Sequence, residues 1–150
     1  MITYNGAIID PIDERDYQLE EVGMFPPVNW IEKKGIRQFE VKDQSQSSSC
    51  VANAVAKILA IENYLEEGRY FPLSARDLYT RRTNNGGGMN FREAMKLGHE
   101  KGITLEYLMP SNGKGEAEMN KADDRTTFTE MTGSILAGGN YISTPFNIDS

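Results

Sequence analysis

The feature that most constrains this chain is a polar loop that runs directly into an alanine-rich segment. The loop covers residues 41–49 and contains four serines, and the only cysteine of the chain, Cys50, follows it immediately. If the segment after the loop is helical, Cys50 lies in its first turn, where free backbone N–H groups and the helix dipole favour a thiolate. The sequence therefore indicates a candidate nucleophile at a helix start.

The segment from Cys50 to about residue 67 has the pattern of a long helix. Its apolar residues recur at three- and four-residue steps, which is typical of an amphipathic helix with a broad buried face. We expect this face to contain Val51, Ala54, Val55, Ile58, Leu59, Ile61, Tyr64 and Leu65. Ser47 or Ser48 is expected to cap the start of the helix, and Gly68 to end it.

Two further helices are indicated by capping residues. Ser74 is followed three residues later by Asp77, as in a capping box, and predicts a short helix to about Arg82. Asn90 is expected to cap a third helix that ends at Gly102. The inward-facing residues of this third helix are expected to be Phe91, Ala94, Met95 and Leu97.

The remaining segments predict little regular structure. Residues 7–9 favour a short strand, and residues 103–109 a loop or short strand. The run Asn-Asn-Gly-Gly-Gly over residues 84–88 predicts a loop that depends on the freedom of glycine in φ. Residues 111–127 are polar, so we expect a surface loop with at most one helical turn around residues 116–121. Residues 138–143 are expected to form a turn and a strand.

Composition excludes several classes of protein. The chain has 150 residues and a net charge of −6, with no basic tract of five or more, which argues against nucleic acid as a partner. No apolar run approaches the roughly 20 residues of a membrane helix, and the first residues do not resemble a signal peptide. A single cysteine excludes an internal disulfide. We therefore expect a cytoplasmic or virion-associated protein with no metal and no cofactor.

The stretch around Cys50 resembles the active-site segment of the papain-like cysteine peptidases, whose pattern is Q-G-x-C-G-S-C-W-A-F. This chain reads Q-S-Q-S-S-S-C-V-A-N over residues 44–53, with Gln44 at the family spacing of six residues before Cys50.

Four other stretches are similar to family segments. These are F-P-P-V-N-W over residues 25–30, L-S-A-R-D-L over residues 73–78, the glycines of residues 86–88 before Met89, and residues 102–110. Together the matches cover most of residues 25–110 in the family order.

The resemblance implies an α+β fold. It consists of the helical left-hand domain built on the nucleophile helix, plus the first strand of a β-rich second domain. On this basis residues 1–35 are an extended arm anchored by Trp30, residues 36–137 the helical domain, and residues 138–150 the start of the β-rich domain. The chain looks truncated, because most of the second domain would lie past residue 150.

The resemblance also implies roles for four residues. Cys50 would be the nucleophile, Gln44 would help hold the oxyanion, and Gly87 and Gly88 would bind the substrate backbone. The family histidine and asparagine are expected about 130–150 residues after the nucleophile. The only histidine, His99, is too early in the chain for that role, and we expect it at a solvent-exposed helix end.

Several positions depart from the family pattern. Ser47 replaces a cysteine that normally forms a disulfide, Ser45 and Ser48 replace loop glycines, and Val51 replaces the aromatic residue beside the nucleophile. These changes look more like compact bacterial or phage members of the family than secreted animal ones.

Three interpretations of Cys50 remain open. It could be a nucleophile whose histidine belongs to a longer parent chain or to a partner, or the relic of a pseudo-peptidase. Such a relic would serve as a structural or interaction subunit of a larger, for instance phage, assembly. Cys50 could also be a plain buried cysteine, with Gln44 a solvated loop residue and the glycines of residues 87–88 simple turn residues.

All but the last interpretation predict a polypeptide substrate or a protein partner on the exposed cleft face, and a place in an oligomeric assembly. We expect negligible peptide hydrolysis by this chain alone, because no group is present to protonate the leaving amine.

Overall fold

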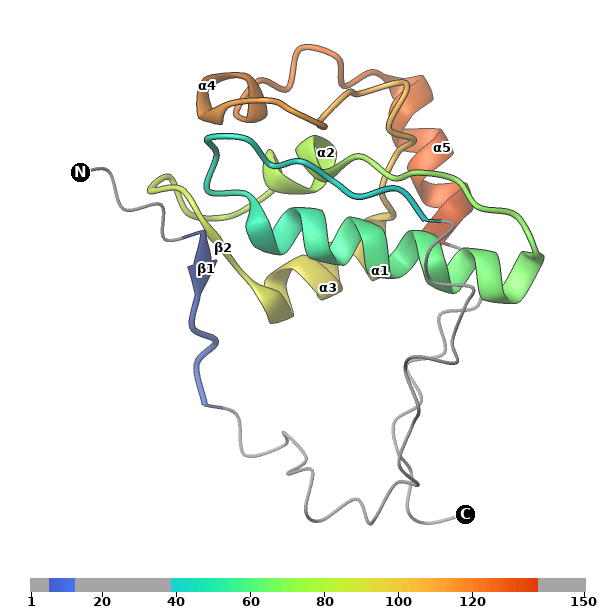
Figure 1. The fold of residues 1–150 in the computed structure, drawn as a ribbon, viewed down its shortest axis with the longest axis horizontal. Helices are drawn as coiled ribbons and strands as arrows, with labels where there is room; N and C mark the ends of the chain where they lie inside the picture. Colours follow the sequence, from blue (N-terminus) through green and yellow to red (C-terminus); the bar gives the residue numbers. More distant parts are fainter. Residues whose placement is uncertain (1–5, 13–38, 138–150) are drawn as a thin grey trace. The chain divides into compact units, whose positions relative to one another are not determined.

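The computed structural model describes residues 6–12 and 39–137 (Figure 1). In chain order the elements are β1 (Ala7–Ile8), α1 (Cys50–Glu67), α2 (Ala75–Tyr79), β2 (Met89–Asn90), α3 (Phe91–Lys101), α4 (Glu116–Met119) and α5 (Thr127–Ala137). Residues 6–10 and 42–137 belong to one compact unit, which contains the core and the candidate site. The expected anchor Trp30, the match at residues 25–30 and the strand at 138–143 lie outside the described residues. The fold is mainly helical with little strand, as predicted.

Helix α1 has the predicted limits, from Cys50 to Glu67. Gly68 ends it in a left-handed conformation (φ 73°), and the Gly68 N–H donates to the Tyr64 carbonyl oxygen. The expected cap was wrong, because the N-cap residue is Ser49 rather than Ser47 or Ser48. The Ser49 hydroxyl makes no capping bond, since it is engaged by the side chains of Ser47 and Asn53.

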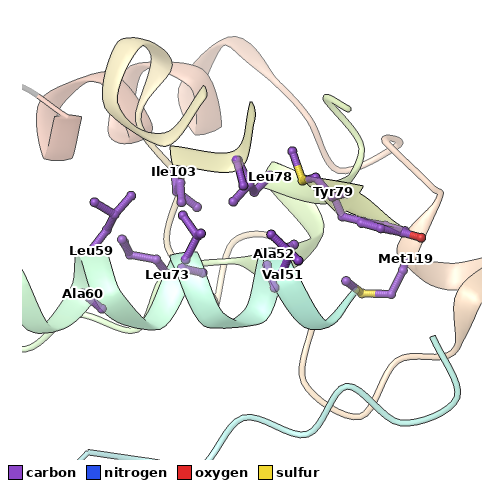
Figure 2. Packing of buried hydrophobic residues seen from close by; sticks show 14 residues of the cluster. Val51, Ala52, Leu59, Ala60, Leu73, Leu78, Tyr79, Ile103 and Met119 are labelled. Atoms are coloured by element: carbon purple, nitrogen blue, oxygen red, sulfur yellow. The ribbon is translucent and has the colours of Figure 1, made fainter. Parts of the chain in front are cut away.

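The buried face of α1 is only partly the one predicted. Val51, Val55 and Leu59 are buried as expected, but Ala54, Ile58 and Leu65 are exposed. Their places are taken by Ala52, Ala56 and Ala60, all fully buried. Figure 2 shows Leu73, Leu78 and Ile103 facing this side of α1. Both α2 and α3 pack on α1, and the three alanines belong to the same core cluster as Val51, Val55 and Leu59.

Helix α2 begins with the predicted cap, because the Ser74 hydroxyl accepts a hydrogen bond from the Asp77 N–H (3.1 Å). It ends at Tyr79, earlier than the predicted Arg82. After Thr80, the next two amides bond to carbonyl groups three residues back, Arg81 N–H to Leu78 (3.1 Å) and Arg82 N–H to Tyr79 (3.4 Å). The chain therefore tightens into a turn instead of continuing the helix.

Helix α3 also has the predicted cap and end. The Asn90 Oδ1 atom accepts from the Glu93 N–H (2.7 Å), and Gly102 follows the last turn. The expectation for Phe91 was wrong: this first residue of the helix is 43 % exposed, beyond the edge of the core. Ala94 is buried, and Met95 and Leu97 pack against the core as partly buried residues.

The close packing of α3 on α1 depends on a buried glycine. A Cβ at Gly98 would lie 2.6 Å from the Leu59 Cδ1 atom, so a larger residue would push this side chain aside. Gly98 therefore permits the short distance between the two helices, which no periodicity of apolar residues would have indicated.

The strand predicted at residues 7–9 is present as β1, and its partner was not predicted. β1 pairs in parallel with β2, with Ala7 opposite Met89 and Ile8 opposite Asn90. The single helical turn predicted around residues 116–121 is α4. Helix α5 had no predicted counterpart. Among the described residues, no helix combines the length and apolarity needed to span a bilayer.

Candidate functional site

Cys50 is the first residue of α1 and carries a free, half-buried thiol. It packs against the edge of the hydrophobic core, next to the buried residues Val51 and Ala52 at the start of the helix. The core therefore fixes the backbone under Cys50, while the side chain stays partly accessible.

The loop before Cys50, residues 43–49, is here called the nucleophile loop, and its own serines hold it. The Ser47 hydroxyl donates to the Gln44 carbonyl oxygen (2.7 Å) and lies 2.6 Å from the Ser49 hydroxyl. The Asn53 Nδ2 atom donates to the Ser49 hydroxyl (2.9 Å) and to the Ser49 carbonyl oxygen (3.0 Å). These bonds lie in a buried position and tie the loop to the first turn of α1.

The start of the nucleophile loop is a tight turn. Ser45 has φ 51°, the left-handed conformation that glycine adopts most easily. The Asp43 carboxylate accepts from the Ser45 N–H (2.8 Å) and so stabilises this turn. The loop thus keeps a glycine-like bend at a position where the family pattern has glycine.

Gln44 lies half-buried within the nucleophile loop. Its Nε2 atom donates to the Ser47 carbonyl oxygen (2.8 Å). A side-chain amide has two N–H donors, so this bond uses one of them. The oxyanion role expected for Gln44 stays a prediction.

The glycine loop, residues 84–88, lies against the nucleophile loop. Gly87 and Gly88 both have positive φ (79° and 72°), as the sequence predicted. A Cβ at Gly87 would lie 3.7 Å from the Ser48 Cβ atom, in ordinary van der Waals contact. The fold therefore brings Cys50, its preceding loop and the two predicted glycines to one place, and their substrate-binding role stays a prediction.

Two residues that the sequence did not single out connect these loops. The Glu116 carboxylate accepts from the Ser48 N–H (2.7 Å) and from the Tyr79 hydroxyl (2.7 Å). The Tyr79 hydroxyl in turn accepts from the Gly88 N–H (3.0 Å). Glu116 lies in a polar stretch that reads as a surface loop, so no local pattern marks it.

The pKa values of Tyr79 and Glu116, the two residues that connect the loops, are shifted from their ordinary values. Burial and the hydrogen bond to Glu116 raise the pKa of Tyr79 to about 12. Burial alone would raise the pKa of Glu116, but the hydrogen bonds from Ser48, Tyr79 and Asn120 outweigh burial and lower that pKa below its usual value. At neutral pH the pair is therefore a neutral phenol bonded to a carboxylate.

An N-terminal segment, residues 6–10, approaches Cys50 at Gly6. A Cβ at Gly6 would lie 2.6 Å from the Cys50 Sγ atom and 2.7 Å from the Ser48 carbonyl oxygen, so only glycine fits there. The Met89 N–H donates to the Gly6 carbonyl oxygen (3.0 Å). At its far end the Asp10 carboxylate accepts from the Arg92 N–H (3.1 Å) at the start of α3. No sequence signal pointed to this arrangement.

His99 lies away from Cys50. It is exposed in the last turn of α3, as predicted, and lines a small cavity with Leu59 and Glu62. Leu59 is nine residues along α1 from Cys50, about 13 Å at the rise of an α-helix. Burial and the neighbouring Glu66 carboxylate raise the pKa of Glu62 in this cavity. Among the described residues, no cluster of histidine, cysteine and acidic side chains is arranged to hold a metal ion.

Comparison with solved structures shows which fold this is. Xylellain, a cysteine protease from Xylella fastidiosa, superimposes with a TM-score of 0.62 at 21% sequence identity, over 88% of this chain and 55% of xylellain. The Amb a 11 cysteine protease, a major ragweed pollen allergen, in its proform, gives a TM-score of 0.54 at 26% identity, over 75% of this chain and 34% of that protein. Neither a family model nor a curated protein sequence matches this chain. The chain thus spans about half of xylellain and a third of the ragweed protein.

Proposed function

We propose that this chain, which has the fold of the papain-like cysteine proteases over part of their length, supplies the nucleophile half of a peptidase site. In this proposal Cys50 is the nucleophile, Gln44 contributes to the oxyanion hole, and Gly87 and Gly88 contact the substrate backbone. The observation that carries the proposal is the main chain at Gly6, just before β1, which lies close against the Cys50 thiol.

The segment at Gly6 supports the proposal because a peptidase must hold an extended chain across its nucleophile. The Gly6 carbonyl oxygen accepts from the Met89 N–H next to the glycine loop, which is a main-chain contact that any peptide could make. A substrate following the same path would be held by its backbone, with its side chains left for specificity.

The start of α1 supports the proposed reaction. A thiolate at Cys50 would attack the scissile carbonyl carbon, forming a C–S bond and placing negative charge on the carbonyl oxygen. N–H groups at the helix start and the second N–H of the Gln44 amide are the donors suited to that charge. The leaving amine then needs a proton. Neither the main-chain N–H groups nor the Gln44 amide can supply it, because loss of a proton would leave either group negatively charged.

We propose that the proton donor comes from a longer parent chain or a partner, since the sequence has only His99, which lines a cavity beside the middle of α1. The chain alone is therefore expected to hydrolyse peptides at a negligible rate. The test is a fluorogenic peptide assay of the purified chain, with Cys50→Ala as the matched control. Cleavage above background that disappears in C50A would contradict this expectation.

A second candidate is a pseudo-peptidase that serves as a structural or interaction subunit. It is favoured by the same segment at Gly6, because a segment of the chain's own that lies against Cys50 leaves less room for a substrate there. Exposed apolar side chains such as Leu65 (74 % exposed) would then contact a protein partner. A cytoplasmic or virion-associated location, and the absence of a nucleic acid partner, also stay predictions.

The pH dependence of alkylation distinguishes the two candidates. An unassisted cysteine thiol ionises at about pH 8.5, whereas a thiol paired with a histidine reacts rapidly near pH 6. The labelling rate of Cys50 by iodoacetamide would be measured from pH 5 to 9, with the chain alone and with cell extract from its source added. A fast phase near pH 6 that appears only with a partner supports the peptidase, and a single rise towards about pH 8.5 under both conditions supports the relic.

A further inference from the structure

The nucleophile loop and the glycine loop are joined by a side chain from a third part of the fold. Helix α4 lies beside the loop that precedes α1 (Figure 1), and its first residue, Glu116, accepts from the Ser48 N–H at 2.7 Å. Through Tyr79 the same carboxylate also reaches the Gly88 N–H. Each loop thus offers a main-chain N–H to one connected pair of side chains.

We propose that Glu116 is a positioning residue that holds the nucleophile loop and the glycine loop at a fixed spacing, directly at Ser48 and through Tyr79 at Gly88. The spacing of the two loops does not depend on the proposed function. The inference rests on that function only where it treats the two loops as the walls of a substrate groove.

The geometry of the carboxylate suits this role. Its Oε2 atom faces the Ser48 N–H, and its Oε1 atom faces the Tyr79 hydroxyl (2.7 Å each). Asn120 fills a further acceptor position on Oε1 through its Nδ2 atom (3.0 Å). A carboxylate accepts several bonds at two separated oxygens, whereas an amide or hydroxyl in this place would have to give up at least one of them.

The Tyr79 ring is itself held in place. The Arg82 guanidinium stacks on it, with its central carbon 3.8 Å from the ring centroid. The Arg82 Nη2 atom donates to the Asn120 Oδ1 atom (2.6 Å), and Asn120 bonds back to Glu116. Glu116, Tyr79, Arg82 and Asn120 therefore form a closed ring of four side chains, which limits the positions that either loop can take.

The effect of Glu116 on the fold as a whole is expected to be small. Helix α4 is a single turn whose fully buried anchor is Met119, not Glu116. Glu116 bonds directly to Ser48, two residues before Cys50. Through Tyr79 it reaches Gly88, one residue before the Met89 N–H that binds the Gly6 carbonyl. Loss of the carboxylate should therefore change the groove more than the core.

Amide hydrogen exchange on the full chain tests this directly. In Glu116→Ala, the exchange of the Ser48 and Gly88 amides should become about tenfold faster or more, measured relative to the Ala56 amide in the buried middle of α1. In Tyr79→Phe, only the Gly88 amide should lose protection, because Ser48 still reaches Glu116. Glu116→Gln, which keeps one acceptor oxygen, should restore part of the protection that the alanine variant loses.

Glu118→Ala is the matched control, since Glu118 is on the same helical turn but is exposed and bonds to Lys114. It should leave both amides unchanged. If Ser48 and Gly88 exchange faster in Glu116→Ala only in proportion to Ala56, Glu116 merely stabilises the fold and the inference is wrong. Equal acceleration in the Glu118 variant would overturn it as well.

A second measurement separates this inference from the proposed function. Cys50 would be labelled with a peptidyl epoxide and with iodoacetamide, and the ratio of the two rates compared between variants. A lower ratio in Glu116→Ala than in the unmodified chain supports positioning of a peptide-binding groove. An unmodified chain with no preference for the peptidyl reagent would count against the peptidase site, and the exchange data alone would then decide the role of Glu116.

Discussion

The two loops beside Cys50 reach their shapes by different means. The buried serines of the nucleophile loop bond to residues at most four positions away, as Ser49 does to Asn53, and the loop reaches distant residues only through Asp43 and Ser48. The glycine loop is bound at Gly88 by Tyr79, which lies nine positions earlier. Tyr79 is bound in turn by Glu116, which lies 37 positions after Tyr79. The Ser47 amide thus bonds within its own loop, to the Gln44 carbonyl oxygen, whereas the Gly88 amide bonds to Tyr79 in another element. Damage to the fold should therefore affect the Gly88 amide more than the Ser47 amide.

The largest expected effect comes from Asp77, which anchors the helix that carries Tyr79. Its carboxylate is 1 % exposed and bonds to Arg81 (2.9 Å) and Arg125 (3.0 Å). Asp77→Ala would leave two partly buried arginines without their partner and should lower the free energy of unfolding by about 3–5 kcal/mol. Urea denaturation measures this loss.

The matched control for that variant is Glu100→Ala, which removes a carboxylate that pairs with Lys96 where both side chains are exposed (51 % and 68 %). It should cost at most about 1 kcal/mol.

Amide exchange at Gly88 should respond to the Asp77 variant more than exchange at Ser47. The reverse order would break the distinction between the two loops.

Ser49→Ala tests the nucleophile loop. It removes the buried hydroxyl that accepts from Asn53, so the Asn53 amide would lose one of its bonds in a site without water access. We expect a loss of about 1–3 kcal/mol in the free energy of unfolding. Ser48→Ala is the control, because Ser48 acts through its main-chain N–H and should cost much less. Equal losses in the two variants would show that the serine network does not hold this loop.

Gly6→Ala tests the segment that covers Cys50. The added Cβ would come within 2.6 Å of Sγ, and the segment should move away because moving it is easier than moving α1. Alkylation of Cys50 should become several-fold faster with little change in the denaturation midpoint. Ala7→Gly, one residue further along, is the control, and an unchanged alkylation rate in Gly6→Ala would mean that the segment does not limit access.

The ionisation of Tyr79 should be visible as a late step in an alkaline titration. Its pKa of about 12 exceeds the ordinary tyrosine value of 10, so its protonated form stabilises the fold below pH 10. That contribution is lost as the pH rises through 12. Absorbance near 295 nm should therefore show a late ionisation step, and Tyr79→Phe should remove this step.

The smallest effect concerns Glu116 in acid. Because its pKa is lowered on folding, the ionised carboxylate stabilises the fold above the ordinary glutamate value of 4.5, and this is lost as the pH falls through the lower folded value. Protection of the Ser48 amide should follow the same course relative to Ala56. In Glu116→Gln that relative protection should be independent of pH over this range, and a slope equal to that of the unmodified chain would assign the change to another group.

Local rules predicted the parts of this fold that depend on neighbouring residues. The caps at Ser74 and Asn90 and the helix ends at Gly68 and Gly102 each follow from side chains or glycines a few residues apart. The motif around Cys50 likewise identified the loops that the fold brings together.

The parts that failed depend on partners far away in the sequence. The face of α1 was partly misassigned because Ala52, Ala56 and Ala60 share the buried side with larger residues such as Leu59, while Ile58 and Leu65 stay outside the core. The pairing of β1 with β2 joins residues 82 apart, and the bond from Ser48 to Glu116 joins residues 68 apart. No periodicity or cap could have indicated Glu116, because what matters about it is its position in the assembled structure.

The short pairing of β1 with β2 has a consequence for how ligands would compete at Cys50. Two paired residues are too few to form a stable strand pair by themselves, so this cover should open and close often. Yet the segment is part of the same chain and returns at an effective concentration of about millimolar. A free peptide must therefore bind the groove well enough to outcompete this tethered ligand, and its apparent affinity would understate its true affinity for the open groove.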